Sequence, residues 1–394
     1  MRQFCLRFSN AGGGVGVVAL VAALILGTAP LDAEEAPLIT IRKGDKVAVS
    51  TEGVSGSGRA LLDAALEACG AIELKPAAQA GYRAAGSTGR GGVSGRLTDS
   101  RGDTVLSKSY DGGLRPAMHQ FADDIVEALT GKPGIAASRI AFVSNRTGRK
   151  EIYTCDYDGA GIQQLTRDNS ISVAPALSRD GGKLAYTGYH SGYADIYLIE
   201  LASGARQRIV KYPGTNSGAA FSPDGRRIAC TISKDGNPEL YVVSARGGGA
   251  KRLTRSRGAE ASPTWGPEGR EIIFTSDDRG SPQLFRVSAS GGRPRLLSTG
   301  YTYCTEPSWS PDGSKVAFNT RSGGSFKIAV LDLRRGGARL LQTSGNCENP
   351  VWGADSRHLI YATGSALVRL DTLSGQTTTL VSGMGKISEP AWSH

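Results

Sequence analysis

Histidine is scarce in this chain. The 394 residues contain four, at positions 119, 190, 358 and 394, and none belongs to an H-x-x-H or H-E-x-x-H zinc motif. A G-x-S-x-G nucleophile elbow is also lacking, and the Asp-Gly turns do not have the ligand spacing of a calcium loop. We therefore expect no metal, no cofactor and no catalytic residue.

Aromatic residues are few as well, at 7% of the chain, and no basic run is interleaved with them. This argues against nucleic-acid binding, although the formal net charge is +10. The charge could favour acidic partners or anionic lipid headgroups, but the Lys and Arg residues are scattered through turns. An ordinary solvated surface is the preferred interpretation.

Long apolar runs are confined to the N-terminus. Arg2 and Arg7 precede residues 15–27 (VGVVALVAALILG), and small residues follow. This pattern predicts a signal peptide at 1–33, cleaved after Ala29 or Ala33, and hence export; a retained N-terminal anchor is the alternative. Cleavage would leave five cysteines and, by loss of Arg2, Arg7 and Asp32, a net charge of about +9.

What the chain does contain is an internal repeat. Six segments share one pattern, in the forms APALSRDG, AAFSPDG, SPTWGPEG, EPSWSPDG, NPVWGADS and EPAWSH. Their equivalent positions, from Pro175 to Pro390, are spaced by 44, 44, 44, 43 and 40 residues. Short apolar runs bounded by Gly, Pro, Asp and Asn fill each repeat, which indicates four antiparallel strands. The fold class is thus mainly β, with a six-bladed β-propeller over 136–394.

The ends of the repeat region predict how the propeller closes. Three strands, near 139–144, 151–156 and 162–166, precede the first proline motif, and the chain ends at His394 just after the last. The final strand, 389–392, should therefore complete the first blade, so that no sheet edge is left open. Trp265, Trp309, Trp352 and Trp392 are expected to pack between blades.

A small α/β domain is predicted over 34–135. Strands are expected at 38–42, 46–50, 93–98 and 104–109, and helices at 59–69 and 114–130. The glycine-rich stretch 81–95 is expected to be flexible.

The segment 118–145 (MHQFADDIVEALTGKPGIAASRIAFVSN), the SPDG motifs and the closing EPAWS resemble the TolB family, the periplasmic component of the Tol–Pal system. The resemblance covers 36–394. It implies a non-enzymatic periplasmic scaffold that binds a Pal-like peptidoglycan-associated lipoprotein through one propeller face and supports envelope integrity and cell division. It also implies contact of the mature N-terminus with a TolA-like inner-membrane protein, although residues 34–44 match only through LITIRKG.

Loops that precede each proline motif should converge on one mouth of the propeller channel. The candidate partner-binding residues there are Ser172, Asn216, Glu260, Ser262, Tyr301, Tyr303, Thr305, Glu306 and Glu348. The alternative is that these are the ordinary polar loops of any propeller.

Cys304 and Cys347 each lie three residues before a motif proline in consecutive blades, which predicts a disulfide; two free thiols, or a pair of metal ligands, are the alternatives. Cys155 and Cys230 lie in strand runs and are expected in the core. A rival function with the same fold is an exported lyase or glycan-processing enzyme with a site at the channel mouth.

Overall fold

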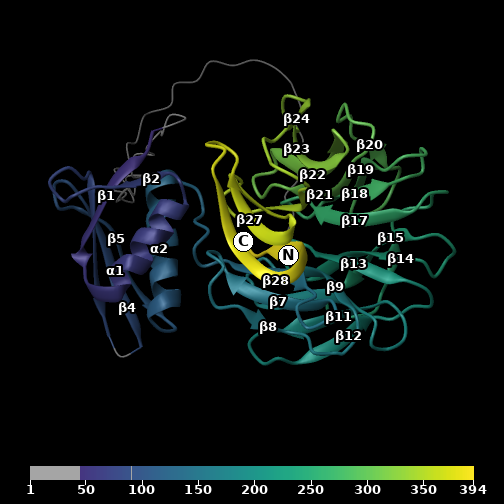
Figure 1. Ribbon diagram of the computed structural model, residues 1–394, viewed down its shortest axis with the longest axis horizontal. Helices are drawn as coiled ribbons and strands as arrows, with labels where there is room; N and C mark the ends of the chain where they lie inside the picture. The colour runs from purple at the N-terminus through teal and green to yellow at the C-terminus, as the bar shows by residue number, and fades with distance from the viewer. Residues whose placement is uncertain (1–44, 90) are drawn as a thin grey trace, which may run out of the picture. The chain divides into compact units, whose positions relative to one another are not determined.

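The computed structural model describes residues 45–89 and 91–394 (Figure 1). The predicted signal peptide and the predicted strand at 38–42 lie outside these residues. Over the described ranges, neither α-helix combines the length and the apolar character that a membrane crossing requires.

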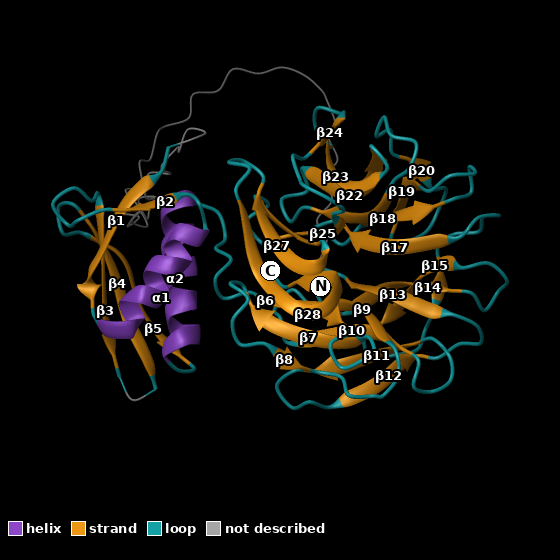
Figure 2. Ribbon diagram, in the orientation of Figure 1, coloured by secondary structure: helices purple, strands orange, loops and turns teal. Residues whose placement is uncertain are grey.

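The N-terminal part is a five-stranded sheet with both helices on one face (Figure 2). The strand order is β2-β1-β3-β4-β5, and β1 pairs in parallel with β2 and β3. The elements are β1 (Val47–Val54), α1 (Gly56–Ala68), β2 (Ile72–Leu74), β3 (Tyr82–Thr88), β4 (Gly92–Asp99), β5 (Thr104–Asp111) and α2 (Leu114–Thr130).

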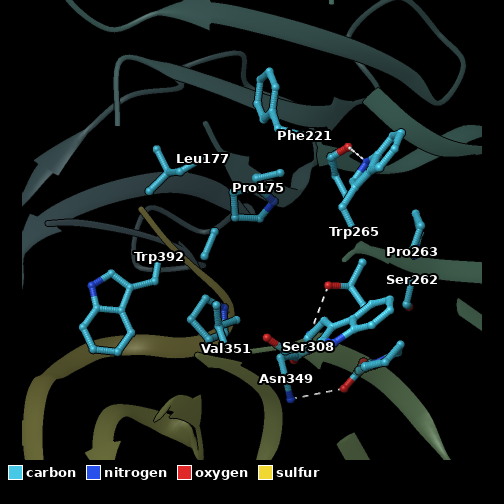
Figure 3. A pocket seen from close by; sticks show the side chains of 18 of the residues that line it. Pro175, Leu177, Phe221, Ser262, Pro263, Trp265, Ser308, Asn349, Val351 and Trp392 are labelled. Atoms are coloured by element: carbon cyan, nitrogen blue, oxygen red, sulfur yellow. Dashed lines mark hydrogen bonds between the residues drawn. The ribbon is translucent and has the colours of Figure 1, made fainter. Parts of the chain in front are cut away.

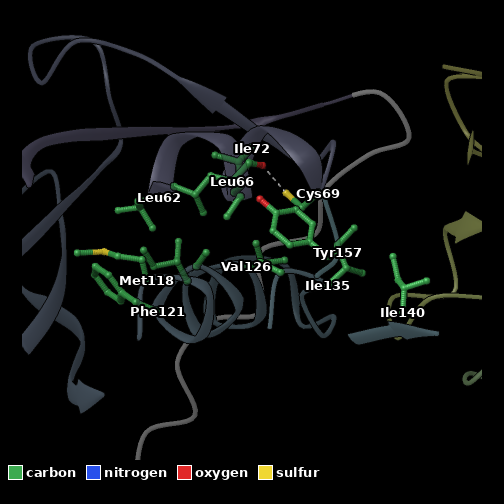
Figure 4. Packing of buried hydrophobic residues seen from close by; sticks show 14 of the residues in the cluster. Leu62, Leu66, Cys69, Ile72, Met118, Phe121, Val126, Ile135, Ile140 and Tyr157 are labelled. Atoms are coloured by element: carbon green, nitrogen blue, oxygen red, sulfur yellow. Dashed lines mark hydrogen bonds between the residues drawn. The ribbon is translucent and has the colours of Figure 1, made fainter. Parts of the chain in front are cut away.

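The apolar face of α2 forms the core of this part. Met118, Phe121 and Val126 of α2 pack against Leu62 and Leu66 of α1, as Figure 4 shows. Apolar residues at helical spacing predicted this face. The helix ends at Gly131, whose φ of 64° is the left-handed conformation that glycine adopts without strain.

The prediction that residues 81–95 are flexible is wrong, because they lie mostly in the antiparallel pair β3 and β4. The many glycines concealed the strands, since they carry no alternating side chains. At least one of them is required by packing. A Cβ on Gly95 would come within 2.7 Å of the Phe121 ring, so glycine lets α2 lie close to the sheet.

The C-terminal part is the predicted propeller. Its strands are β6 (Arg139–Ser144), β7 (Glu151–Asp156), β8 (Gln163–Gln164), β9 (Ser172–Leu177), β10 (Lys183–Gly188), β11 (Asp195–Glu200), β12 (Arg206–Val210), β13 (Asn216–Phe221), β14 (Arg227–Ile232), β15 (Glu239–Ser244), β16 (Lys251–Arg252), β17 (Glu260–Trp265), β18 (Glu271–Ser276), β19 (Gln283–Ser288), β20 (Arg295–Leu296), β21 (Thr305–Trp309), β22 (Lys315–Ser322), β23 (Ser325–Asp332), β24 (Ala338–Leu340), β25 (Glu348–Trp352), β26 (His358–Ala362), β27 (Gly364–Asp371) and β28 (Thr377–Trp392).

Blades 2 to 5 are separate four-stranded antiparallel sheets, which start at β9, β13, β17 and β21. Their second strands are buried almost throughout, because each sheet is packed between two others. This explains why those strands read as continuous apolar runs. Trp265 packs in one layer with residues of blades 3 and 4, as predicted.

Blades 6 and 1 form one seven-stranded sheet through the long strand β28. Its first half pairs with β27, and its last residues, Ile387 to Trp392, pair with β6. This confirms the predicted closure. The final strand of the chain is therefore the innermost strand of blade 1.

Candidate functional site

The innermost strands of the six blades surround a central cavity of about 560 Å³. These are β9, β13, β17, β21, β25 and the end of β28. We call the end of the channel where these strands begin the mouth; the Pro-Asp-Gly turns lie at the opposite end. Figure 3 shows Pro175, Pro263, Asn349 and Val351 around this space.

A β-bulge recurs in every innermost strand. In β17, for example, Ser262 and Pro263 together lie opposite Phe274 of β18, since Ala261 pairs with Thr275 and Thr264 with Ile273. The same irregularity occurs in the other five blades. Proline suits this position because it has no N–H to leave unpaired.

The residue before each motif proline, or before Ala219 in blade 3, has a left-handed backbone. The φ values are 49° at Ala174, 63° at Gly218, 50° at Ser262, 53° at Glu306, 55° at Asn349 and 53° at Glu389. This conformation costs a residue with a side chain on the order of 1 kcal/mol. All six line the channel, and we call them the bulge ring.

Hydrogen bonds between consecutive blades hold the two glutamates of the ring. The backbone N–H of Asn349 donates to Glu306 Oε2 at 3.1 Å, and that of Ala174 donates to Glu389 Oε2 at 2.6 Å. Each carboxylate thus satisfies a peptide group of the next blade. Lys150 Nζ lies 3.7 Å from Glu389 Oε1.

Two of the six ring residues, Glu306 and Glu389, are acidic. Exposed Glu348 adds a third carboxylate beside Glu306 and Glu389. Burial, together with the negative charges of Glu348 and Glu389, raises the pKa of Glu306 to about 7. Near neutral pH the site can therefore accept a hydrogen bond or a cationic group, and Glu306 can also donate through its protonated form.

Of the nine residues predicted at the mouth, Ser262, Glu306 and Glu348 line the channel. Tyr301 is half-buried beside Phe318, with ring centroids 6.0 Å apart, and is not a channel residue. Tyr303 is half-buried near Phe326, and Thr305 pairs with Asn319 in the sheet. Whether any of them contacts a partner stays a prediction.

Ser172, Asn216 and Glu260 are not on the accessible mouth, which corrects their predicted position. Their exposed fractions are 0, 0 and 2%. Each stands at the start of an innermost strand and binds the preceding loop. Asn216 Nδ2, for example, donates to the carbonyl of Tyr212 at 2.7 Å, and Glu260 Oε2 accepts from Ser256 Oγ at 3.2 Å.

The predicted disulfide is wrong, because Cys304 and Cys347 are both free and buried. Cys304 packs with Val316 and Phe318, whereas Cys347 packs in another cluster with Ala317. Successive side chains of β22 point to opposite faces, so blade 5 separates the two thiols. Cys155 and Cys230 are in the core, as predicted.

Sequence reasoning missed Glu389 and Lys150 as channel residues. For Glu389 a signal existed, because it occupies the same repeat position as Ser262 and Glu306. Lys150 comes from the β6–β7 hairpin, and the repeat does not mark it.

Comparison with known proteins agrees with this geometry. The family described as PD40, TolB beta propeller domain, matches residues 126–394. The TolB homolog of Chlorobaculum tepidum is 46% identical over 97 residues, which is 24% of this chain and 22% of that protein. The Tol-Pal system protein TolB of Desulfosudis oleivorans is 46% identical over 80 residues, which is 20% of this chain and 18% of that protein. The matches thus span about a fifth of the length of these curated relatives.

A solved structure extends the similarity over most of the chain. The crystal structure of TolB from Acinetobacter baumannii superposes with a TM-score of 0.76 at 26% identity, covering 89% of this chain and 97% of that one. The family match alone takes in more than half of the chain, including every innermost strand. The chain belongs to the TolB β-propeller family.

Proposed function

We propose that this chain is a periplasmic scaffold of a Tol–Pal-like envelope complex. It binds a Pal-like lipoprotein at the channel mouth and thereby supports outer-membrane integrity and cell division. It acts by binding and not by catalysis. The name of the Desulfosudis oleivorans relative, a Tol-Pal system protein, supports the choice of system.

The observation that carries the proposal is a group of three glutamates at the mouth, two of which belong to the bulge ring. Glu306, Glu348 and Glu389 lie around one end of a channel of about 560 Å³, so a loop that enters it meets three carboxylates. Glu306 and Glu389 lie in the bulges, and backbone N–H groups of the next blade hold their carboxylates. A preorganised site of this kind binds with little loss of side-chain entropy. It suits a partner loop that presents basic or amide groups.

Calorimetric titration with the Pal-like domain of the same organism tests this proposal. We expect micromolar or tighter binding, and the double variant Glu306→Gln/Glu348→Gln should weaken it about tenfold or more, equivalent to about 1.4 kcal/mol. A matched control is Glu200→Gln/Glu268→Gln, which removes the same charge at the other end of the strands, from half-buried Glu200 and exposed Glu268. It should leave binding unchanged.

The pH dependence provides a second readout. Because the pKa of Glu306 is about 7, its carboxylate becomes charged as the pH rises through neutrality. A basic loop should therefore bind more tightly near pH 8 than near pH 6. This difference in affinity should be smaller in the Glu306→Gln variant. Absence of binding heat, or an equal loss in both double variants, would refute the mouth as the binding site.

Two further expectations remain proposals. Contact with a TolA-like protein would involve residues 34–44, which lie outside the described residues, and export would depend on residues 1–33. The alternative of an exported enzyme predicts that the Pal-like domain does not bind, so the same titration separates the two functions.

A further inference from the structure

Seven exposed basic side chains lie on the outer hairpins of three consecutive blades. The hairpins are β15–β16, β19–β20 and β23–β24, with sequences RGGGAKR, SGGRPRL and RRGGARL. We call these residues the basic arc: Arg246, Lys251, Arg293, Arg295, Arg334, Arg335 and Arg339. Among the described residues none of them forms an ion pair, whereas Arg252, Arg270 and Arg286 of the same blades do.

The arc lies at the end of the propeller opposite the mouth. Each blade is an antiparallel sheet, so the hairpin between its third and fourth strands lies at the same end as the turn between its first and second. That end carries the Pro-Asp-Gly turns. Figure 2 shows β20 and β24 on the outer margin of neighbouring blades.

Two carboxylates near the arc form no ion pair with an arc side chain. Asp332 accepts hydrogen bonds from the backbone N–H groups of Arg334 and Arg335, at 2.9 Å each. Glu268 pairs with Arg270 at 3.2 Å. Asp332 offsets part of the charge at Arg335, and all seven arc residues remain exposed.

The other three blades serve as an internal comparison. The equivalent segments of blades 1 and 6 read DGAGIQQ and LSGQTTT, without a basic residue. In blade 2, Arg206 and Arg208 are bonded to Asp168 and Asp195, at 2.5 and 3.1 Å. Charged side chains do protect exposed sheet edges, but that need applies to all six blades. At the hairpins between third and fourth strands, exposed cations without an ion pair thus occur in three adjacent blades among the described residues, which indicates a binding surface.

The chemistry of the arc fits a phospholipid surface. Guanidinium groups bind phosphate oxygens bidentately, and each basic residue near an anionic bilayer contributes about 1 kcal/mol. Leu296, which is 40% exposed, lies among the cations and could enter the headgroup region. The three hairpins contain no aromatic side chain on which a base could stack. Three hairpins at one end of a rigid propeller present their charges together to a flat partner.

We propose that the basic arc docks the propeller on an anionic phospholipid surface and leaves the channel mouth free for a protein partner. This surface is distinct from the proposed partner site, so the two proposals can fail independently.

Vesicle co-sedimentation of the whole chain tests the proposal. We expect binding to vesicles that contain phosphatidylglycerol, weak binding to phosphatidylcholine vesicles, and release at about 1 M salt, where the Debye length is about 3 Å. The variant Arg293→Gln/Arg295→Gln/Arg334→Gln/Arg335→Gln should bind at least about tenfold more weakly. Replacement of the same four residues by Lys should retain binding.

The matched control removes the same charge near the mouth, as Arg146→Gln/Arg149→Gln/Arg255→Gln/Arg257→Gln, at four exposed positions. It should keep vesicle binding. An equal loss in both glutamine variants, equal binding to neutral vesicles, or binding to a DNA duplex without binding to vesicles would overturn the proposal. Thermal unfolding of each variant shows that it is folded.

Discussion

Replacement of Glu260 by Gln should make the propeller more stable at alkaline pH. The Glu260 side chain is 2% exposed, and its carboxylate accepts hydrogen bonds from Ser256 and Ser276. Burial, reinforced by the negative charge of Glu239, raises its pKa from 4.5 to about 7. The folded protein therefore holds the proton more tightly than the unfolded chain does.

The sign follows from proton linkage. Between about pH 4.5 and pH 7 the unfolded chain releases this proton while the folded protein keeps it, so stability falls as the pH rises. Above pH 7 the folded state contains a charged carboxylate in a buried position. A pKa difference of this size lowers the free energy of unfolding by about 3 kcal/mol once the carboxylate is charged. A glutamine stays neutral, so the variant does not lose this stability.

Urea unfolding followed by tryptophan fluorescence measures the effect, with Trp265 on the same strand as a buried reporter. We expect the free energy of unfolding of Glu260→Gln, relative to that of the unchanged protein, to be about 2 to 3 kcal/mol larger near pH 8 than near pH 5. Glu268→Gln, at an exposed turn of the same blade, is the control and should show no such difference. The same relative stability at both pH values would refute the reasoning.

Three further predictions concern packing and the thiols. Trp352→Ala should lower the free energy of unfolding by about 3 to 5 kcal/mol in urea titration, because the ring is 1% exposed between blades. Gly95→Ala should lower it by about 1 to 3 kcal/mol, because the new Cβ would meet the Phe121 ring at 2.7 Å. Iodoacetamide added to urea-unfolded protein without reductant should alkylate both Cys304 and Cys347, since both are free thiols, as intact-mass measurement would show.

Each of these has a control or a contrary outcome. Leu373→Ala changes a side chain that is 54% exposed and should leave stability nearly unchanged. Gly89→Ala places its Cβ in open space and should be tolerated, so an equal loss at both glycines would contradict the packing argument. A pair of cysteines that resists alkylation until reductant is added would contradict the free-thiol assignment.

The repeat could be predicted because it depends on local chemistry that recurs along the chain. Proline, Asp-Gly turns and apolar runs at a period near 44 residues specify one blade after another. The turn in blade 3 shows why: Ser222 Oγ accepts from the N–H of Arg227 at 2.9 Å, and Gly225 takes a φ of 66°. Three strands precede the first motif and none follows the last, which also predicted that β28 completes the first blade and closes the propeller.

The candidate site could be predicted only in part. The period places Ser172, Asn216, Glu260 and the bulge ring at the same end of the strands. It does not say that Ser172, Asn216 and Glu260, two positions before the bulge, turn into the loops while the bulge residues face the channel. The bulge reverses the expected alternation of side chains, and this depends on pairing with the second strand.

The amino-acid sequence by itself determined the architecture: the number of blades, their order, the turns and the closing strand, because these follow from contacts between residues near in the chain or at equal repeat positions. The tertiary structure decided which side chains are accessible. It separated Cys304 from Cys347 by a sheet, buried Glu260, brought Glu306, Glu348 and Glu389 to one mouth, and left the basic arc without partners. Accessibility and electrostatic pairing depend on neighbours from other blades, and a linear pattern does not contain them.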